Sequence, residues 1–223
     1  MRRAAAAAAL LLLSCAALAA AGCGKSASTS PAELALERED LVFVARALQS
    51  LQSQANAEVA ATKAAWPQIA YGLPARNAGL GSPEIRAAIE SAERLDLPTL
   101  LEEQHAAALT GPAYGIAGLY RDYSGLAGRS WQMIAASIAQ IEHGSPAAAR
   151  FARANVALYI DGIYDAHFGL AQIGKQLLPA YTKLGGGEVF GAALTQSEVD
   201  GLAQNYSEAN DRLEPHVAVK LGS

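Results

Sequence analysis

The sequence predicts an all-α protein, an up-and-down helical bundle of the four-helix type with extra short helices. Alanine is abundant and β-branched residues are sparse, which favours helix along the whole chain. Apolar residues recur at steps of three and four in three long segments, and no segment shows the alternation of a strand. The connections between these segments are short, so we expect neighbouring helices to run antiparallel.

The first long helix is expected to start at residues 30–33. Ser30 can cap it, a proline suits its first position, and Glu33 completes a capping box. Pro67 lacks an amide hydrogen and crowds the preceding turn, so it should end or kink the helix, and residues 72–81 should form a loop. The predicted apolar stripe consists of Leu41, Val44, Leu48, Leu51, Ala55, Val59, Thr62 and Trp66.

A shorter helix should follow, because Ser82 and Pro83 repeat the same start signal. We expect this helix to stop before Pro98, where a further helical piece would run to about Leu109. Residues 110–112, Thr-Gly-Pro, are expected to break the chain before the next long helix.

The second long helix is predicted from Ala113 to about His143, with Gly144 as its C-terminal stop. The third should start at residues 145–146, Ser-Pro, and end at Pro179. The stripe of the second contains Ile116, Leu119, Tyr123, Leu126, Trp131, Ile134, Ile138 and Ile141. The stripe of the third contains Val156, Ile160, Ile163, His167, Leu170, Ile173 and Leu177.

The C-terminal part should hold one more helix. Residues 185–187 are three glycines and predict a flexible loop. Thr195 and Glu198 form a capping box that predicts a helix running to about Leu213, before Pro215. We therefore expect residues 31–223 to form a single helical domain.

The first 23 residues have the order of a secretory signal peptide. Arg2 and Arg3 form a basic tip, residues 4–21 are uncharged and mostly apolar, and small residues precede Cys23. Residues 20–23, Ala-Ala-Gly-Cys, resemble the lipobox of bacterial lipoproteins, with alanine where that family usually has leucine. The resemblance implies cleavage of residues 1–22, a diacylglyceryl group on the Cys23 thiol, and an acyl chain such as palmitate on the new amine.

Three other interpretations of this leader stay open. Residues 4–21 have nearly the length of a membrane span. Ordinary signal-peptidase cleavage would release a free secreted protein. Cys15 is a second cysteine that could carry the lipid, although the apolar stretch before it is short.

Composition favours the lipid-anchored interpretation. The chain has 2 cysteines, and removal of Cys15 with the leader would leave Cys23 alone, so a thioether to lipid explains the leftover thiol. Residues 24–30 are small and polar and predict a flexible tether with a reach of roughly 15 Å. The net charge of −4 becomes −6 without Arg2 and Arg3, which argues against nucleic acid as a partner.

Two candidate sites lie around the histidines. His167 falls on the apolar stripe between Ile163 and Leu170 and should point inward. Burial with a hydrogen bond to a tyrosine hydroxyl or a carbonyl is one interpretation, and a ligand-pocket contact or an axial haem ligand, with Met133 as partner, is the other. Glu102 and His105 form a single Glu-x-x-His pair, which supplies too few ligands for a metal centre. We therefore predict no metal site, and Met133 is more simply a core residue.

Carboxylates, tyrosines and glycines make up the other candidate residues. Asp161 and Asp165 lie four residues apart, either as a solvated acidic face or as a pair for acid–base or cation chemistry. Tyr120, Tyr123 and Tyr164 accompany glycines that each cost a helix about 1 kcal/mol relative to alanine. The glycines predict either close helix packing or room for a small ligand. They are Gly111, Gly115, Gly118, Gly125, Gly128, Gly162, Gly169 and Gly174.

No recognised catalytic motif is found in the sequence. We therefore expect a lipid-anchored lipoprotein, on the outer face of the cytoplasmic membrane or on an outer membrane, that binds an envelope protein or a small molecule and is not an enzyme. The expected membrane contact is the lipid itself, and no other cofactor is predicted. A metal- or haem-binding bundle using His167 is the alternative, and a hydrolase using Asp161 and Asp165 is a third possibility.

Overall fold

The structure is a computed structural model that describes residues 29–73, 79–95 and 108–215. The described residues form six helices and no strand, which confirms the predicted all-α bundle. The chain divides into two units between Glu33 and Leu34. The helices are α1 Pro31–Ile69, α2 Pro83–Glu93, α4 Gly111–His143, α5 Pro146–Lys183, α6 Gly186–Phe190 and α7 Gln196–Ser207.

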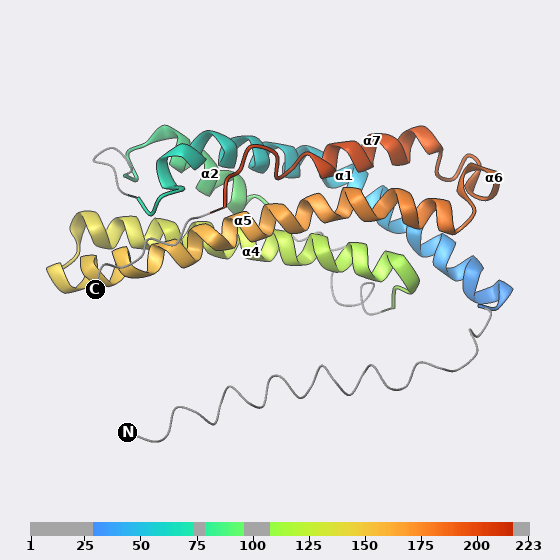
Figure 1. Ribbon diagram of the computed structural model, residues 1–223, viewed down its shortest axis with the longest axis horizontal. Helices are drawn as coiled ribbons and strands as arrows, with labels where there is room; N and C mark the ends of the chain where they lie inside the picture. The colour runs from blue at the N-terminus through green and yellow to red at the C-terminus, as the bar shows by residue number, and fades with distance from the viewer. Residues whose placement is uncertain (1–28, 74–78, 96–107, 216–223) are drawn as a thin grey trace, which may run out of the picture. The chain divides into compact units, whose positions relative to one another are not determined.

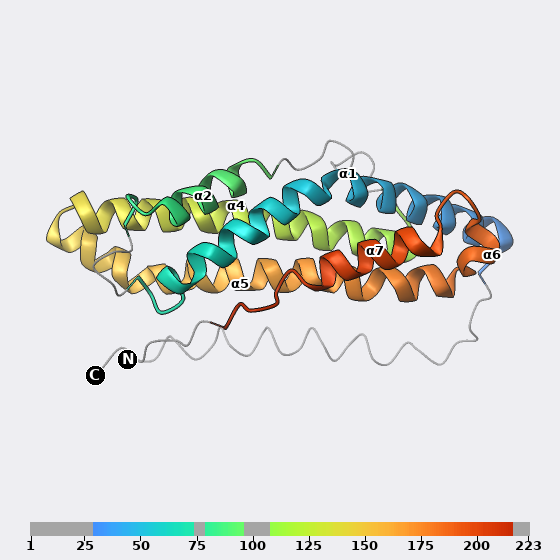
Figure 2. The same ribbon diagram turned by 90° about the horizontal axis from the view of Figure 1, so that it is seen from above.

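The helices from residue 34 onward lie in two layers (Figure 1). One layer is the antiparallel hairpin of α4 and α5, and the other consists of α1, α2 and α7. Figure 2 shows that α1 crosses the hairpin diagonally, with α2 beside α4 in one half of the bundle and α7 beside α5 in the other. Three long helices therefore run through the bundle, and α2 and α7 each supply the fourth helix of one half.

The predicted start signals are confirmed at the N-termini of four helices. The side chains of Ser82, Ser145 and Thr195 each accept a hydrogen bond from a backbone amide in the first turn of α2, α5 and α7. Ser30 and Glu33 form the predicted capping box at the start of α1, through amide–side-chain bonds of 2.6 and 3.2 Å. These caps satisfy amides that have no partner within the helix, so they fix where each helix begins.

Two expected helix ends are placed wrongly by the sequence. Pro179 does not end α5, which continues to Lys183, because Ala180, Tyr181 and Leu184 beyond it are buried in the core. That packing outweighs the hydrogen bond that a proline at this position removes. Likewise the last helix ends at Ser207 rather than near Leu213, whereas α1 ends at Ile69, only two residues past Pro67.

The glycines at 185–187 are also more ordered than predicted. Gly185 and Gly186 have φ of +117° and +57°, a left-handed backbone that glycine adopts without steric cost. This turn starts the short helix α6, so the expected flexible loop is wrong. The ring of Phe190 in α6 stacks on Tyr181 with centroids 4.9 Å apart, which fixes α6 against the end of α5.

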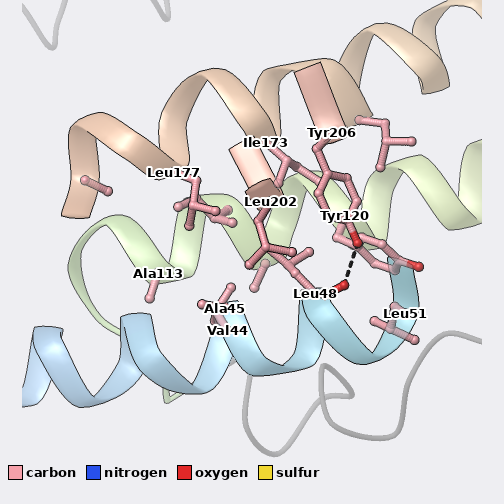
Figure 3. Packing of buried hydrophobic residues seen from close by; sticks show 14 of the residues in the cluster. Val44, Ala45, Leu48, Leu51, Ala113, Tyr120, Ile173, Leu177, Leu202 and Tyr206 are labelled. Carbon is pink, nitrogen blue, oxygen red and sulfur yellow. Dashed lines mark hydrogen bonds between the residues drawn. The ribbon is translucent and has the colours of Figure 1, made fainter. Parts of the chain in front are cut away.

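The core consists of two apolar clusters, one in each half of the bundle. The α7-side cluster includes Leu41, Leu48, Tyr120, Leu170, Leu177, Leu202 and Tyr206. The α2-side cluster includes Trp66, Ile69, Ile85, Trp131, Ile134, Ile160 and Ile163. In Figure 3, side chains of the α7-side cluster from α1, α4, α5 and α7 meet, and the Tyr206 hydroxyl donates a 2.7 Å hydrogen bond to the Leu48 carbonyl.

Some predictions concern residues outside the described ranges. The leader with Cys15 and Cys23, and most of the tether, belong to residues 1–28. Most of the helical piece expected before Leu109, with Glu102 and His105, falls in residues 96–107. Within the described part of the chain, every helix is too short or too polar to cross a membrane.

Candidate functional site: a buried polar layer

Five side chains form a polar layer at the junction of the two apolar clusters. Helix α1 contributes Glu58 and Thr62, which lie one turn apart on its inner face. Helix α4 contributes Tyr123 and Trp131, and α5 contributes His167. The exposed fraction of these side chains is 0–1%, so the layer has no contact with solvent.

Glu58 is the common acceptor of this layer. The hydroxyl of Thr62 donates to its Oε1 at 2.7 Å, and the hydroxyl of Tyr123 donates to its Oε2 at 2.7 Å. The Nε2 atom of His167 lies 2.9 Å from Oε2. Trp131 completes the layer by donating from Nε1 to the Thr62 hydroxyl at 3.2 Å. Charge-assisted hydrogen bonds of this kind are about twice as strong as neutral ones.

Both ring nitrogens of His167 face acceptors. Nε2 faces the Glu58 carboxylate, and Nδ1 lies 3.3 Å from the backbone carbonyl of Ala209, just beyond α7. A ring that carries a proton on each nitrogen satisfies both contacts, whereas either neutral tautomer leaves one nitrogen lone pair facing an oxygen. The geometry therefore assigns a buried imidazolium–carboxylate pair that joins α1, α5 and the segment after α7.

The electrostatics of the layer agree with an ionised Glu58. Burial raises the pKa of the Glu58 carboxyl, but the charge and hydrogen bond of His167, with the hydroxyls of Tyr123 and Thr62, lower it by more. The net pKa lies below the ordinary value of 4.5. Burial, with the adjacent Glu58 charge, holds the pKa of the Tyr123 phenol well above 10, so its hydroxyl stays a donor.

An edge-to-face series of rings extends the layer into the α7-side cluster. The ring of Tyr123 lies 6.1 Å from that of His167 and 5.7 Å from that of Tyr120, and Tyr120 lies 6.5 Å from Tyr206. Such pairs add about 0.5–1.5 kcal/mol each beyond the burial of their area. The Tyr120 hydroxyl is buried without a hydrogen-bond partner among the described residues. The predicted residues Tyr120, Tyr123 and His167 are thus brought together.

The remaining predicted residues lie apart from this layer. Tyr164 is partly buried and packs against the α2-side cluster. Asp165 is exposed and Asp161 half-buried, on the outer side of α5. Met133, expected in the core, is 42% exposed, so that prediction is wrong: it lies on the outward side of α4, past the buried Ser130 and Trp131.

The glycines of α4 and α5 have two different environments. A side chain at Gly174 would meet the backbone of α7 at Ala203 and Ser207, and one at Gly162 would meet the Ser130 hydroxyl. These two glycines allow neighbouring helices to approach closely, as the packing interpretation expects. At Gly118 and Gly169 an added Cβ would meet no atom within 4 Å.

The arrangement of the layer determines what it can do chemically. A metal or haem iron at His167 would have to displace the contact to Glu58 or the one to Ala209. Among the described residues, no group of three His, Cys, Asp or Glu side chains is placed to hold a metal ion. A hollow of about 190 Å³ lies elsewhere, between Ser53, Gln54 and Ala57 of α1 and Ser91 and Arg94 near the end of α2.

Glu58 is the residue that sequence reasoning missed. It lies between Ala55 and Thr62 on the predicted apolar stripe of α1, at the same steps of three and four. A lone acidic residue at such a position signals a buried partner, because an unpaired buried charge is very costly. Its partner His167 lies 109 residues further along the chain, also on an apolar stripe.

Comparisons with known proteins add no further assignment to this geometry. No family model, curated protein or solved structure shows a significant match to the chain.

Proposed function

We propose that this chain is a lipid-anchored protein of a bacterial cell envelope whose helical bundle is a non-enzymatic interaction module. The lipobox-like residues 20–23 and the small polar residues 24–30 support the anchor. Two features support the interaction role: the polar layer is buried inside the bundle, and the outer face of α5 exposes apolar side chains. In this proposal the buried polar residues hold the bundle together, and binding takes place on its outside.

The closed interior supports binding on the outside. Tyr123 and His167, two of the residues expected to line a ligand pocket, use their polar atoms on Glu58 and on the backbone. Gly174, one of the glycines for which the sequence predicted either close packing or room for a ligand, receives the backbone of α7. A small ligand bound between α5 and its neighbouring helices would have to separate helices that are already in contact.

The outer face of α5 carries the observation on which the interaction role rests. Phe151 and Leu158 are 68% and 66% exposed, more than any other large hydrophobic side chain among the described residues. They lie seven residues apart, so both project from the same side of α5. Ala154, also exposed, lies between them at the intermediate position of this heptad spacing. An exposed apolar stripe with this period is the surface that a partner helix covers.

The anchor is tested by mass analysis of the processed protein from bacterial membranes. We expect a polypeptide that begins at Cys23 and carries diacylglyceryl and N-acyl groups. The Cys23→Ala variant should keep its leader and lose the lipid. An unmodified thiol at position 23 in the wild-type protein would disprove the anchor.

The interaction role is tested with a photo-crosslinking amino acid at position 158 of the full chain, expressed in bacteria and crosslinked while it is attached to the membrane. We expect a discrete protein adduct at position 158. The matched control places the same amino acid at Lys175, an exposed position of α5 outside the apolar stripe. Equal labelling at the two positions would remove the outer face of α5 as a binding surface.

A further inference from the structure

We propose that the occupant of the outer face of α5 is a second copy of this chain, packed antiparallel about a two-fold axis near Leu158. The inference rests on the proposed function, because it names the partner of the same surface. Its basis is the order of side chains along that face. Basic, apolar and acidic positions follow one another in a way that is complementary to itself when reversed.

Two exposed charges of this face, one basic and one acidic, are arranged nearly symmetrically about Leu158. Arg150 lies eight residues before it and Asp165 seven residues after it, or about 12 and 10.5 Å along the helix axis. Both side chains belong to exposed residues. Among the ion pairs of the described residues, neither Arg150 nor Asp165 takes part. A two-fold axis at Leu158 therefore brings Arg150 of each copy beside Asp165 of the other.

The apolar side chains follow the same symmetry. Leu158 meets Leu158 of the second copy at the centre of the contact, and Ala154 lies about 6 Å along the helix axis from this centre. Phe151 lies about 10.5 Å before the axis and Phe168, which is 49% exposed, about 15 Å after it. Each end of the contact therefore receives Phe151 from one copy and Phe168 from the other. A parallel arrangement would instead place Arg150 beside Arg150 and Asp165 beside Asp165.

Self-complementarity is what an isologous dimer requires, because the same patch must recognise itself in reverse. The overlap of the two α5 helices covers residues 146–170, since α5 begins at Pro146 and the axis lies near Leu158. Lys175 lies outside this overlap and provides a control of the same charge change. Every residue used in the test projects away from the core, so the variants leave the polar layer intact.

The test exchanges the charges. We expect Arg150→Glu and Asp165→Arg each to weaken dimerisation of the detergent-solubilised full chain about tenfold, because each places like charges side by side. The double variant Arg150→Glu/Asp165→Arg should regain wild-type dimerisation. Lys175→Glu should leave it unchanged. Light scattering after size-exclusion chromatography measures the dimer, and circular dichroism checks that each variant is folded.

The outcomes separate this inference from the proposed function. Recovery in the double variant, with an adduct at position 158 that contains two copies of this chain, supports the dimer. Single reversals without effect, or a double variant that stays monomeric, overturn it. An adduct at position 158 with a different protein overturns the dimer and leaves the interaction role in place. Absence of any adduct overturns both.

Discussion

The inner and outer faces of α5 break the usual distribution of side chains in opposite ways. The inner face buries His167 completely, and the outer face exposes Phe151 and Leu158. The first departure is explained within the chain, because Glu58 and the Ala209 carbonyl satisfy the buried ring. The second has no such explanation, since the two exposed side chains gain no stability from solvent. The comparison separates a residue that holds the fold from residues that are available for binding.

Breaking the inner face should have the largest effect. His167→Leu leaves the Glu58 carboxylate buried without its counter-charge, and we expect it to lower the free energy of unfolding by about 3–5 kcal/mol. Glu58→Leu should cost a similar amount, because it leaves the imidazolium and the Tyr123 hydroxyl unpaired. Urea unfolding followed by circular dichroism measures both losses.

The double variant Glu58→Leu/His167→Leu tests whether the two residues act as a pair. Once both charges are gone, no unpaired charge remains, so the loss should be smaller than the sum of the two single losses by at least about 1 kcal/mol. Strictly additive losses would show that the pair is not coupled.

Low pH should have the next largest effect, through the buried carboxylate on the inner side of the bundle. The pKa of Glu58 is lowered in the folded state, so its contribution to stability is present above the unfolded pKa of about 4.5 and is lost as pH falls through the folded value. We expect the free energy of unfolding of the wild-type protein to fall as pH decreases below about 4.5. The double variant without Glu58 and His167 should show a shallower decrease, measured by urea titrations at a series of pH values.

A surface carboxylate complicates this titration and also provides its control. Glu198 is hydrogen-bonded by Arg46 and Thr195, which lower its pKa to about 2. Its contribution is likewise lost on acidification, from about pH 4.5 downward. The variant Glu198→Gln should remove only the contribution of this exposed carboxylate and keep most of the wild-type decrease in the free energy of unfolding with falling pH. A slope that disappears in Glu198→Gln would contradict the role of Glu58.

Glycine substitutions on α5 compare its inner and outer faces directly. We expect their effect on the free energy of unfolding to be intermediate between those of the buried pair and of the exposed side chains. Gly174→Ala pushes a methyl group into the backbone of α7, so we expect a loss of about 1–3 kcal/mol. Gly169→Ala, five residues earlier on the same helix, meets no atom and should gain up to about 1 kcal/mol from helix propensity. Thermal unfolding of the two variants in parallel gives the signs. A loss at Gly169 would mean that its side is also packed.

The sequence predicted the helices better than it predicted the contacts between them. Capping residues such as Ser82 and Thr195 act on their own first turn, so a local pattern locates the starts of α2 and α7. Pro179 misled the prediction because its neighbours Ala180 and Tyr181 are held by distant helices. The inward direction of His167 followed from its stripe. Its partner Glu58 did not, because pairing across 109 residues depends on how the helices pack.

Changes on the outer face should have the smallest effect on stability. Leu158→Ser and Phe151→Ser replace side chains that are about two-thirds exposed, so we expect the free energy of unfolding of the isolated chain, measured at low protein concentration, to change by less than about 0.5 kcal/mol. The same variants should reduce self-association in concentrated samples, because they remove the apolar centre of the proposed contact.

This combination distinguishes a binding surface from an incidental one. Substituting a residue that stabilises the fold lowers both stability and association, as expected for His167. Substituting a residue that only serves binding reduces association while the chain stays folded. The protein concentration at which the stability and association measurements diverge reports the strength of the contact. If Leu158→Ser instead unfolds the chain at low concentration, the outer face belongs to the core of an obligate dimer, and the contrast between the two faces of α5 disappears.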